Sequence, residues 1–345
     1  MFKLKLKTTQ DIIQFLKLYI PSIALGTALE LGIFWQLSKK PHNAEKIAEM
    51  NSIPIHRSQA LLELLTKLGL LEKKNEMYEA STIAQEAILK RYSAETWAFF
   101  AEEFQDHYPL LNDLTYNISL SDNLWNMQSI KPPDWFDQLK NNHEYAKKFT
   151  YGLYEYHLSF AKKFAQIFDI SGVEKMMDIG GGSGVISLEL LKSHSQMKAV
   201  VIDIENVCKY GREIAAKTPV NERISYEVHD FLKDELPKGF DLIIQCDAGI
   251  YREDFFKKLR KLLIKNGRLV IIANINDDSA YLRYPNCQES LYMAINRFCS
   301  SLEVPSIKHF PLTIENVKQF LLWGGFQKVK YDIWDRGEVI IQAFS

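Results

Sequence analysis

A glycine-rich loop is the sequence feature that most constrains how this chain of 345 residues can fold. Between a short apolar run (175–179) and an apolar helical pattern (185–193), the chain reads Asp178-Ile179-Gly180-Gly181-Gly182-Ser183-Gly184. Glycines in such a turn permit positive φ and remove the Cβ atoms that would keep a ligand off the backbone. The N-terminus of the following helix presents free N–H groups. The loop therefore predicts a ligand-binding turn between a strand and a helix.

The spacing of the glycines and two downstream carboxylates indicate which class of ligand the loop binds. A dinucleotide fingerprint starting at Gly180 would need a glycine at Val185, so the loop does not match that pattern. Asp203 ends the next predicted strand, where a carboxylate can accept hydrogen bonds from both hydroxyls of a ribose. Asp230 and Phe231 follow the third predicted strand, where they could bind an adenine amino group and cover the ring. A nucleoside with an unphosphorylated ribose fits best, although a helix cap and a solvated turn are the structural alternatives.

The chain from about residue 169 onward alternates apolar strand patterns with helical ones. Strands are predicted at 175–179, 199–203, 224–228, 240–245 and 267–273, and helices at 185–193, 207–217, 255–264 and 314–322. Such alternation implies parallel strands with right-handed crossovers, hence a doubly wound α/β sheet. Two last strands, 328–334 and 338–344, are predicted to form an antiparallel hairpin around Arg336-Gly337.

The first part of the chain, residues 1–95, has a helical period instead. One apolar helix face is predicted from the spacing of Ile12, Phe15, Leu16, Tyr19 and Ile20. Helices at 44–50 and 58–68 and a hairpin at 70–80, turning at 73–75, follow in the order of a winged helix. The second helix carries few basic or amide groups, which favours a structural or dimerising domain over DNA binding. Residues 96–168 are predicted to form a helical linker whose many aromatic residues suit a substrate pocket for a flat, apolar molecule, before the third domain, 169–345.

Composition and charge exclude several classes of function. Lys and Arg number 42 against 43 Asp and Glu, so no positive excess favours nucleic acid. The nearly uncharged run Leu18–Leu29 is shorter than the roughly 20 residues that cross a membrane. The four cysteines form no C-x-x-C pair, and no metal-ligand spacing is present. We expect a cytoplasmic protein with no metal and no nucleic-acid or membrane partner.

The glycine loop, Asp203 and Asp230-Phe231 resemble the S-adenosylmethionine (SAM) site of class I methyltransferases. Residues 28–34, 47–48, 65–71 and 78 resemble the dimerisation domain of small-molecule O-methyltransferases, the group of the plant caffeate and acetylserotonin enzymes and their bacterial relatives. Residues 261–272 and 313–329 match the later part of that catalytic domain. The resemblance implies a Rossmann-like seven-stranded domain, an N-terminal helical winged-helix dimerisation domain, a homodimer, SAM as methyl donor and a small acceptor, aromatic or polycyclic. It assigns the cofactor to Asp178, Gly180, Gly182, Asp203, Asp230, Phe231 and Cys246.

One departure from the family pattern concerns the general base. The family places a catalytic histidine shortly after the fourth strand, where this chain has Ile250, and Cys246 stands where a lysine is often found. Methyl transfer needs a base only if the acceptor enters protonated, because the sulfonium already activates the methyl group. The resemblance thus implies O-methylation, and methylation of nitrogen or carbon stays open. The candidate bases are His157, Asp247, Tyr251 and His309.

Two other functions remain open at this point. The missing histidine also suits a methyltransferase fold that performs a SAM-assisted reaction without methyl transfer. A winged helix joined to a nucleoside-binding domain also suits a regulator that senses a small molecule.

Overall fold

The computed structural model describes residues 7–105, 135–273, 313–334 and 338–345. The chain divides into two compact units, residues 1–120 and 121–345, and each is described by itself. The predicted division at residues 95 and 168 is finer than this one and stays a prediction.

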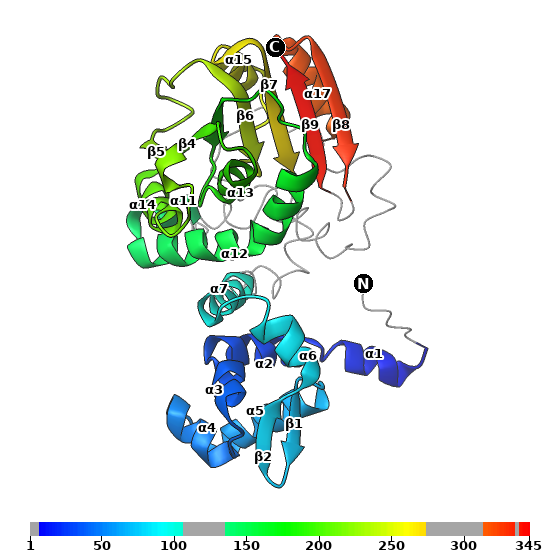
Figure 1. The fold of residues 1–345 in the computed structure, drawn as a ribbon. Helices are drawn as coiled ribbons and strands as arrows, with labels where there is room; N and C mark the ends of the chain where they lie inside the picture. Colours follow the sequence, from blue (N-terminus) through cyan, green and yellow to red (C-terminus); the bar gives the residue numbers. More distant parts are fainter. Residues whose placement is uncertain (1–6, 106–134, 274–312, 335–337) are drawn as a thin grey trace. The chain divides into compact units, whose positions relative to one another are not determined.

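The first unit consists of helices and one small hairpin (Figure 1). Its elements are α1 (Thr9–Phe15), α2 (Tyr19–Glu30), α3 (Ile33–Lys39), α4 (Ala44–Asn51), α5 (Ile55–Lys67), β1 (Leu71–Lys74), β2 (Met77–Ala80), α6 (Thr82–Ala84), a π-helical turn (Gln85–Leu89) and α7 (Ala94–Gln105). Phe34, Ile47, Leu62, Leu65 and Tyr78 form the centre of its core. The predicted order of two helices and an antiparallel hairpin is confirmed.

Two local details of this unit correct the prediction. The hairpin turns at Asn75 and Glu76, not at 73–75, and both have positive φ (48° and 62°), as two-residue hairpin turns require. Helix α5 begins at Ile55 rather than at residue 58, because the extended backbone of Pro54 ends the preceding turn.

The apolar face predicted near the N-terminus does not pack into this unit. Ile12, Phe15, Leu16, Tyr19 and Ile20 are all exposed. Helices α1 and α2 with the turn between them form a 22-residue stretch, Thr9–Glu30, which is long and apolar enough to cross a membrane. The shortness of the uncharged run is therefore not sufficient to exclude a membrane span. A single such stretch is weak evidence for one, since a core helix or a signal sequence passes the same test.

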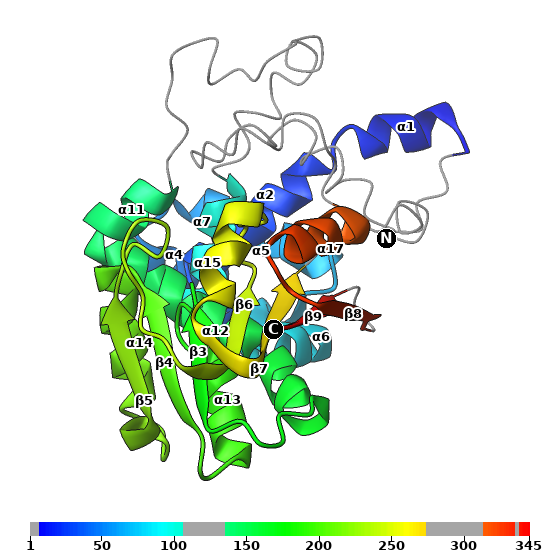
Figure 2. The same ribbon diagram turned by 90° about the horizontal axis from the view of Figure 1, so that it is seen from above.

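The second unit is built around one seven-stranded sheet (Figure 2). Its strands are β3 (Lys175–Ile179), β4 (Lys198–Asp203), β5 (Ile224–Val228), β6 (Phe240–Cys246), β7 (Leu263–Ala273), β8 (Lys328–Ile333) and β9 (Val339–Phe344). Their order is β5-β4-β3-β6-β7-β9-β8, with β3 to β7 parallel and β9 antiparallel to both neighbours. The predicted doubly wound sheet and its final antiparallel pair are confirmed, while Arg336-Gly337 lies outside the described residues.

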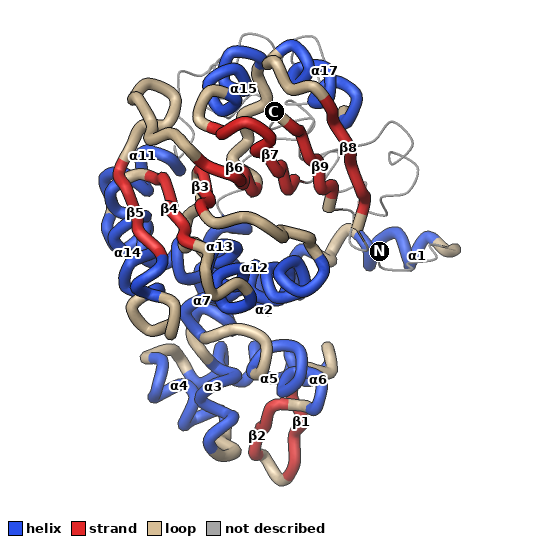
Figure 3. Tube along the Cα trace, turned by 45° about the horizontal axis from the view of Figure 1, so that its top comes forward, coloured by secondary structure: helices blue, strands red, loops and turns tan. Residues whose placement is uncertain are grey.

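Helices cover both faces of this sheet (Figure 3). They are α11 (Trp135–Asn141), α12 (His143–Ile167), α13 (Val185–Ser193), α14 (Glu205–Ala215), α15 (Glu253–Arg260) and α17 (Ile314–Trp323). Side chains of α12, α13 and α14 share one core cluster, and those of α15 and α17 share the other. The helix predicted at 255–264 is too long, because the apolar residues from Leu263 onward already belong to β7.

Candidate active site

Three loops meet at Gly180, at the carboxyl ends of the parallel strands. A Cβ placed on Gly180 would lie 3.1 Å from the Cβ of Ala248 and 3.7 Å from Cε1 of Phe231. The glycine loop after β3 therefore touches the segments that follow β5 and β6. In a doubly wound sheet, this edge beside the reversal of strand order is where ligands bind. The reversal here lies between β3 and β6.

Side chains of β4 and β5 hold the glycine loop in its conformation. Gly182 and Gly184 both have positive φ (59° and 73°), and Gly182 N donates to Asp203 Oδ2 at 2.9 Å. The hydroxyl of Tyr226, on β5, donates to the carbonyl of Ser183 at 2.8 Å. A Cβ on Gly184 would lie 2.5 Å from that hydroxyl oxygen, so only glycine fits there. Sequence reasoning missed Tyr226, which stands between Ser225 and Glu227 in a strand of mixed polarity and so leaves no distinct signal.

Asp203 presents its carboxylate at the tip of β4, as predicted. Oδ2 accepts from Gly182 N, and Oδ1 accepts from Ile204 N at 2.8 Å. Burial raises the pKa of this carboxyl to about 6, although the two N–H groups act in the opposite direction. Each oxygen keeps acceptor capacity beyond its one backbone donor, so the group can still receive the hydroxyls of a ribose.

Asp178 lies beneath the loop rather than on its surface. Its side chain is 1% exposed, and Oδ2 accepts from the hydroxyl of Ser187 at 2.6 Å. Burial, aided by the charge of Asp203 and opposed by the hydrogen bond from Ser187, raises its pKa to about 6. A Cβ on Gly181 would lie 2.5 Å from the Asp178 carboxyl carbon, so the acid and the glycine are matched. Within the described part of the chain, Asp178 Oδ1 has no hydrogen-bond partner.

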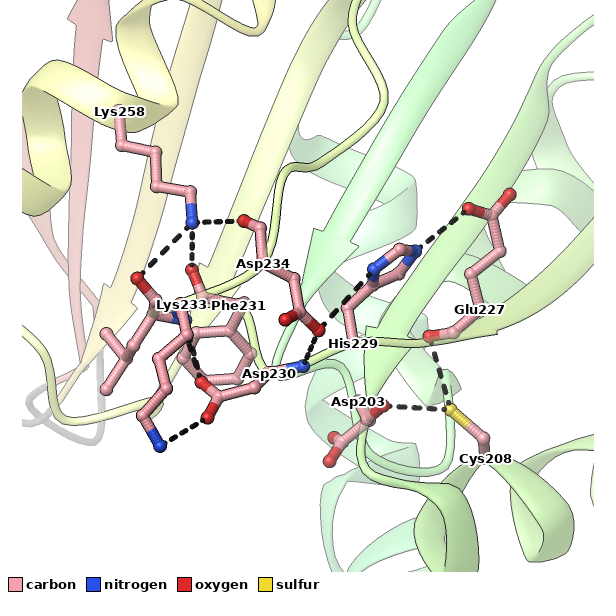
Figure 4. A network of polar contacts seen from close by, with 10 residues as sticks. Asp203, Cys208, Glu227, His229, Asp230, Phe231, Lys233, Asp234 and Lys258 are labelled. Carbon is pink, nitrogen blue, oxygen red and sulfur yellow. Dashed lines mark hydrogen bonds and ion pairs between the residues drawn. The ribbon is translucent and has the colours of Figure 1, made fainter.

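The segment after β5 folds into a tight turn (Figure 4). Asp230 Oδ1 accepts from the N–H groups of Leu232 (3.1 Å) and Lys233 (3.3 Å), and Oδ2 pairs with Lys233 Nζ at 3.0 Å. Partial burial raises the pKa of Asp230, but these donors outweigh it and hold the pKa below the usual value. The Phe231 ring lies beside Gly180 and 6.0 Å from the ring of Phe255 on α15. Phe231 is thus placed where it can cover a ring held by the glycine loop.

The segment after β6 has an irregular backbone, and a buried side chain hydrogen-bonds to it. Asp247 has φ 47° and an exposed side chain, and Gly249 has φ 70°. Gln245, fully buried, donates from Nε2 to the carbonyl of Ile250 at 2.9 Å. The Ile250 side chain itself is buried with the α15 core, so the position that the family gives to a histidine holds a packing residue.

Two further residues predicted for the site, Cys246 and Tyr251, are affected by burial. It raises the pKa of the Cys246 thiol well above its usual value and also raises that of the Tyr251 phenol. The charges of Asp247 and Asp178 act in the same direction on the pKa of Cys246. Both groups therefore stay protonated near neutral pH.

His157 lies on α12, half-buried, with its ring edge-on to Tyr156 at 5.0 Å. Burial lowers its pKa, so the imidazole is neutral at neutral pH. Phe160 and Phe164, three and seven residues further along, share its helix face and contact Trp334 just after the carboxyl end of β8. The place of His157 in the site stays a prediction. His309 lies outside the described residues.

No group of three or more His, Cys, Asp or Glu side chains in the described ranges could hold a metal ion.

A comparison with protein families identifies this arrangement. Residues 120–299, more than half of the chain, match the model of the O-methyltransferase domain. The chain belongs to the O-methyltransferase domain family. Its recognition from the glycine loop, Asp203 and Asp230-Phe231 is thereby confirmed.

Several curated relatives of this O-methyltransferase-family protein share about a quarter of their aligned residues with it. The 3-hydroxy-5-methyl-1-naphthoate 3-O-methyltransferase of Streptomyces sahachiroi is 26% identical over 64% of this chain and 62% of that enzyme. The methyltransferase PigF of a Serratia species is 26% identical over 75% of this chain and 74% of its own length. The L-tyrosine C(3)-methyltransferase of Streptomyces lavendulae is 22% identical over 78% and 76%. The chain spans less than two thirds of the naphthoate enzyme.

The solved structure of PigF with SAH has the same fold as this family member. The two superimpose with a TM-score of 0.81 over 98% of this chain and 100% of that one, at 19% identity. This agreement confirms the predicted architecture of a seven-stranded α/β domain with an N-terminal helical domain.

Proposed function

We propose that the protein is a SAM-dependent methyltransferase that acts on a small metabolite, aromatic or polycyclic. The observation that carries this proposal is the meeting of three loops at Gly180, with the Asp203 carboxylate hydrogen-bonded to Gly182. Membership of the O-methyltransferase domain family supports the reaction class. The relatives act on ring systems by name, which supports the class of acceptor.

The residues at this edge fit the cofactor. A Cβ at Gly182 would meet nothing within 4 Å, so the loop leaves room there for an adenosyl group, and the Asp203 oxygens can accept its ribose hydroxyls. Phe231, which lies against Gly180, would cover the adenine, and Asp230 would accept a hydrogen bond from its amino group. The chemistry that SAM supplies when bound is a methyl group already activated by a sulfonium. The protein's task is then to orient the acceptor in line and to exclude water.

Proton removal from the acceptor does not use position 250 in this proposal. Ile250 is buried, and Tyr251 and Cys246 stay protonated near neutral pH. Asp247 is exposed, and His157 is a neutral imidazole, so these two can accept a proton from a phenol. An acceptor that reacts at carbon or at a neutral nitrogen does not need a base to make it nucleophilic, and a relative named for C-methylation is consistent with that route.

We also propose a homodimer, formed by the exposed apolar face of α1 and α2. Large apolar side chains left in water on one monomer mark an interaction surface. Those exposed here are Ile12, Ile13, Phe15, Leu16, Leu18, Tyr19, Ile20 and Ile23. Light scattering of the purified protein tests this, with a dimer expected and a monomer of Leu16→Glu/Tyr19→Glu as the matching control. A wild-type monomer at micromolar concentration would contradict it.

The proposed activity is tested by methyl transfer to a panel of phenols, amines and electron-rich rings. The wild type should transfer the labelled methyl group of SAM to at least one acceptor, and Asp203→Ala should not. Asp332→Ala, an exposed carboxylate on the edge strand β8, is the matched control and should retain full activity. Consumption of SAM with an acceptor product that lacks the label would instead favour the SAM-assisted reaction without methyl transfer.

A further inference from the structure

A lysine on α15 holds the loop that carries Phe231 (Figure 4). Lys258 Nζ donates to the backbone carbonyls of Phe231 at 2.9 Å, Leu232 at 3.4 Å and Asp234 at 2.6 Å. An ammonium has three N–H donors and no acceptor, so three carbonyls match its capacity. Lys258 is half-buried, which makes these charge-assisted bonds stronger than they would be in open water.

The other hydrogen bonds of this loop are mostly local. Asp230 N donates to Asp234 Oδ2 at 2.8 Å, and the N–H groups of Lys233 and Asp234 donate back to the carbonyl of Asp230. These hydrogen bonds fix the conformation of the turn, but they do not connect it to any other element. Lys258 joins it to a different element, one that packs against the sheet through Phe255, Phe256 and Leu259.

A second contact from the same helix reaches the same loop. Phe255 lies one turn before Lys258 on α15, and its ring contacts that of Phe231 at 6.0 Å between centroids. Lys258 thus holds the Phe231 backbone while Phe255 meets its ring. Their combined effect is to keep Phe231 against Gly180, where the glycine loop approaches it.

We propose that Lys258 is a positioning residue for the cofactor: it fixes the Phe231 loop over the adenine and so sets the affinity for SAM. This inference rests on the proposed function. Loss of the lysine leaves the turn formed but free to move away from Gly180, so the cofactor must order the loop when it binds. The acceptor does not contact this loop in the proposal, so its own KM should not change.

The neighbouring residue provides a matched control. Lys257 is exposed and pairs with Glu253 on its own helix, so Lys257→Met removes the same charge from the same helix without touching the loop. Lys258→Arg keeps the charge and several donors, and should recover part of the loss. Comparing Lys258→Met with these two variants separates the loop contact from net charge and helix propensity.

Calorimetry with S-adenosylhomocysteine (SAH) on the full chain tests the inference. Lys258→Met should raise the Kd roughly tenfold, Lys257→Met should stay within about twofold, and Lys258→Arg should lie between. In turnover, KM for SAM should rise with little change in kcat or in KM for the acceptor, a split that general loss of stability would not produce. If Lys258→Met does not fold, Lys258→Gln takes its place with the same expectation.

Equal Kd values for Lys258→Met and Lys257→Met would overturn the inference and leave the proposed function intact. A wild-type protein that does not bind SAH would overturn both.

Discussion

The two sides of the active site are built differently. On the cofactor side, the glycine loop is fixed by Gly182 N–Asp203 and Tyr226–Ser183 hydrogen bonds and by contacts that admit no Cβ. The segment after β6, which we propose faces the acceptor, has an exposed Asp247 and Gly249, both with positive φ, and the buried Gln245 side chain holds it through a hydrogen bond to the carbonyl of Ile250. The comparison teaches that the glycine loop is fixed by several contacts that leave no space for a side chain, whereas the segment after β6 is held through one buried amide and exposes Asp247 to solvent.

The largest expected effect tests whether a histidine belongs on the acceptor side. Ile250→His should lower the free energy of unfolding by about 2 kcal/mol, because it places an imidazole among apolar side chains. Methyl transfer should not increase. Thermal or urea unfolding and turnover measure the two results. A stable and more active variant would show that position 250 faces the acceptor, and would contradict the described burial.

The next effect tests how tightly the cofactor side is packed. A Cβ on Gly211 would collide with the Tyr226 ring and lie 3.1 Å from the carbonyl of Gly182. Gly211→Ala should therefore destabilise the protein by roughly 1–3 kcal/mol and weaken SAH binding. Tyr226→Val in the same chain removes the ring and should restore part of the stability. A double-mutant cycle with no coupling between the two changes would show that the ring does not control the loop.

The pH dependence should differ between stability and binding. Asp178 and Asp203 have pKa values raised to about 6 in the folded state, against 3.8 for the free group. The folded state then binds more protons between these values, so the contribution of the pair is full below pH 3.8 and is lost as the pH rises through about 6. Ribose binding needs the charged Asp203, so SAH affinity should instead rise about tenfold from pH 5 to pH 7. Calorimetry across this range measures it, and affinity that does not depend on pH would contradict the role of Asp203.

The smallest effect concerns Tyr251 on the acceptor side. Because burial keeps its phenol protonated, Tyr251→Phe should change kcat by less than about threefold and leave the pH–rate profile unchanged. His157→Gln and Asp247→Asn, measured with a phenolic acceptor, are the comparison. A large loss confined to Tyr251→Phe would identify the tyrosine as the base.

Much of the fold follows from local patterns, and the exceptions have physical causes. The strand 175–179 and the helix 185–193 were predicted with the right bounds, because glycines separate two unambiguous apolar periods. The helix ending at Arg260 was predicted too long, since an apolar run does not distinguish the end of a helix from the start of a buried strand.

In the candidate site too, some residues could be predicted from local sequence patterns and others could not. Asp203 and Phe231 are visible in the sequence because each follows a strand at the edge where ligands bind. Tyr226 and Lys258 are not visible, because their partners come from other elements and meet them only in the folded chain. These partners are the carbonyl of Ser183 for Tyr226 and the carbonyls of residues 231, 232 and 234 for Lys258. Contacts to backbone carbonyls leave no pattern in the partner's residue types.

The central claim is that the edge around Gly180 binds an adenosyl group whose ribose is held by Asp203. Calorimetry of the wild type and Asp203→Asn with SAH tests it most directly, since this substitution keeps the shape of the side chain and removes its charge. We predict measurable binding by the wild type and a Kd about 100-fold higher for the variant, as expected for loss of charge-assisted hydrogen bonds. Equal affinity of the two proteins, or no heat from the wild type, would contradict the account.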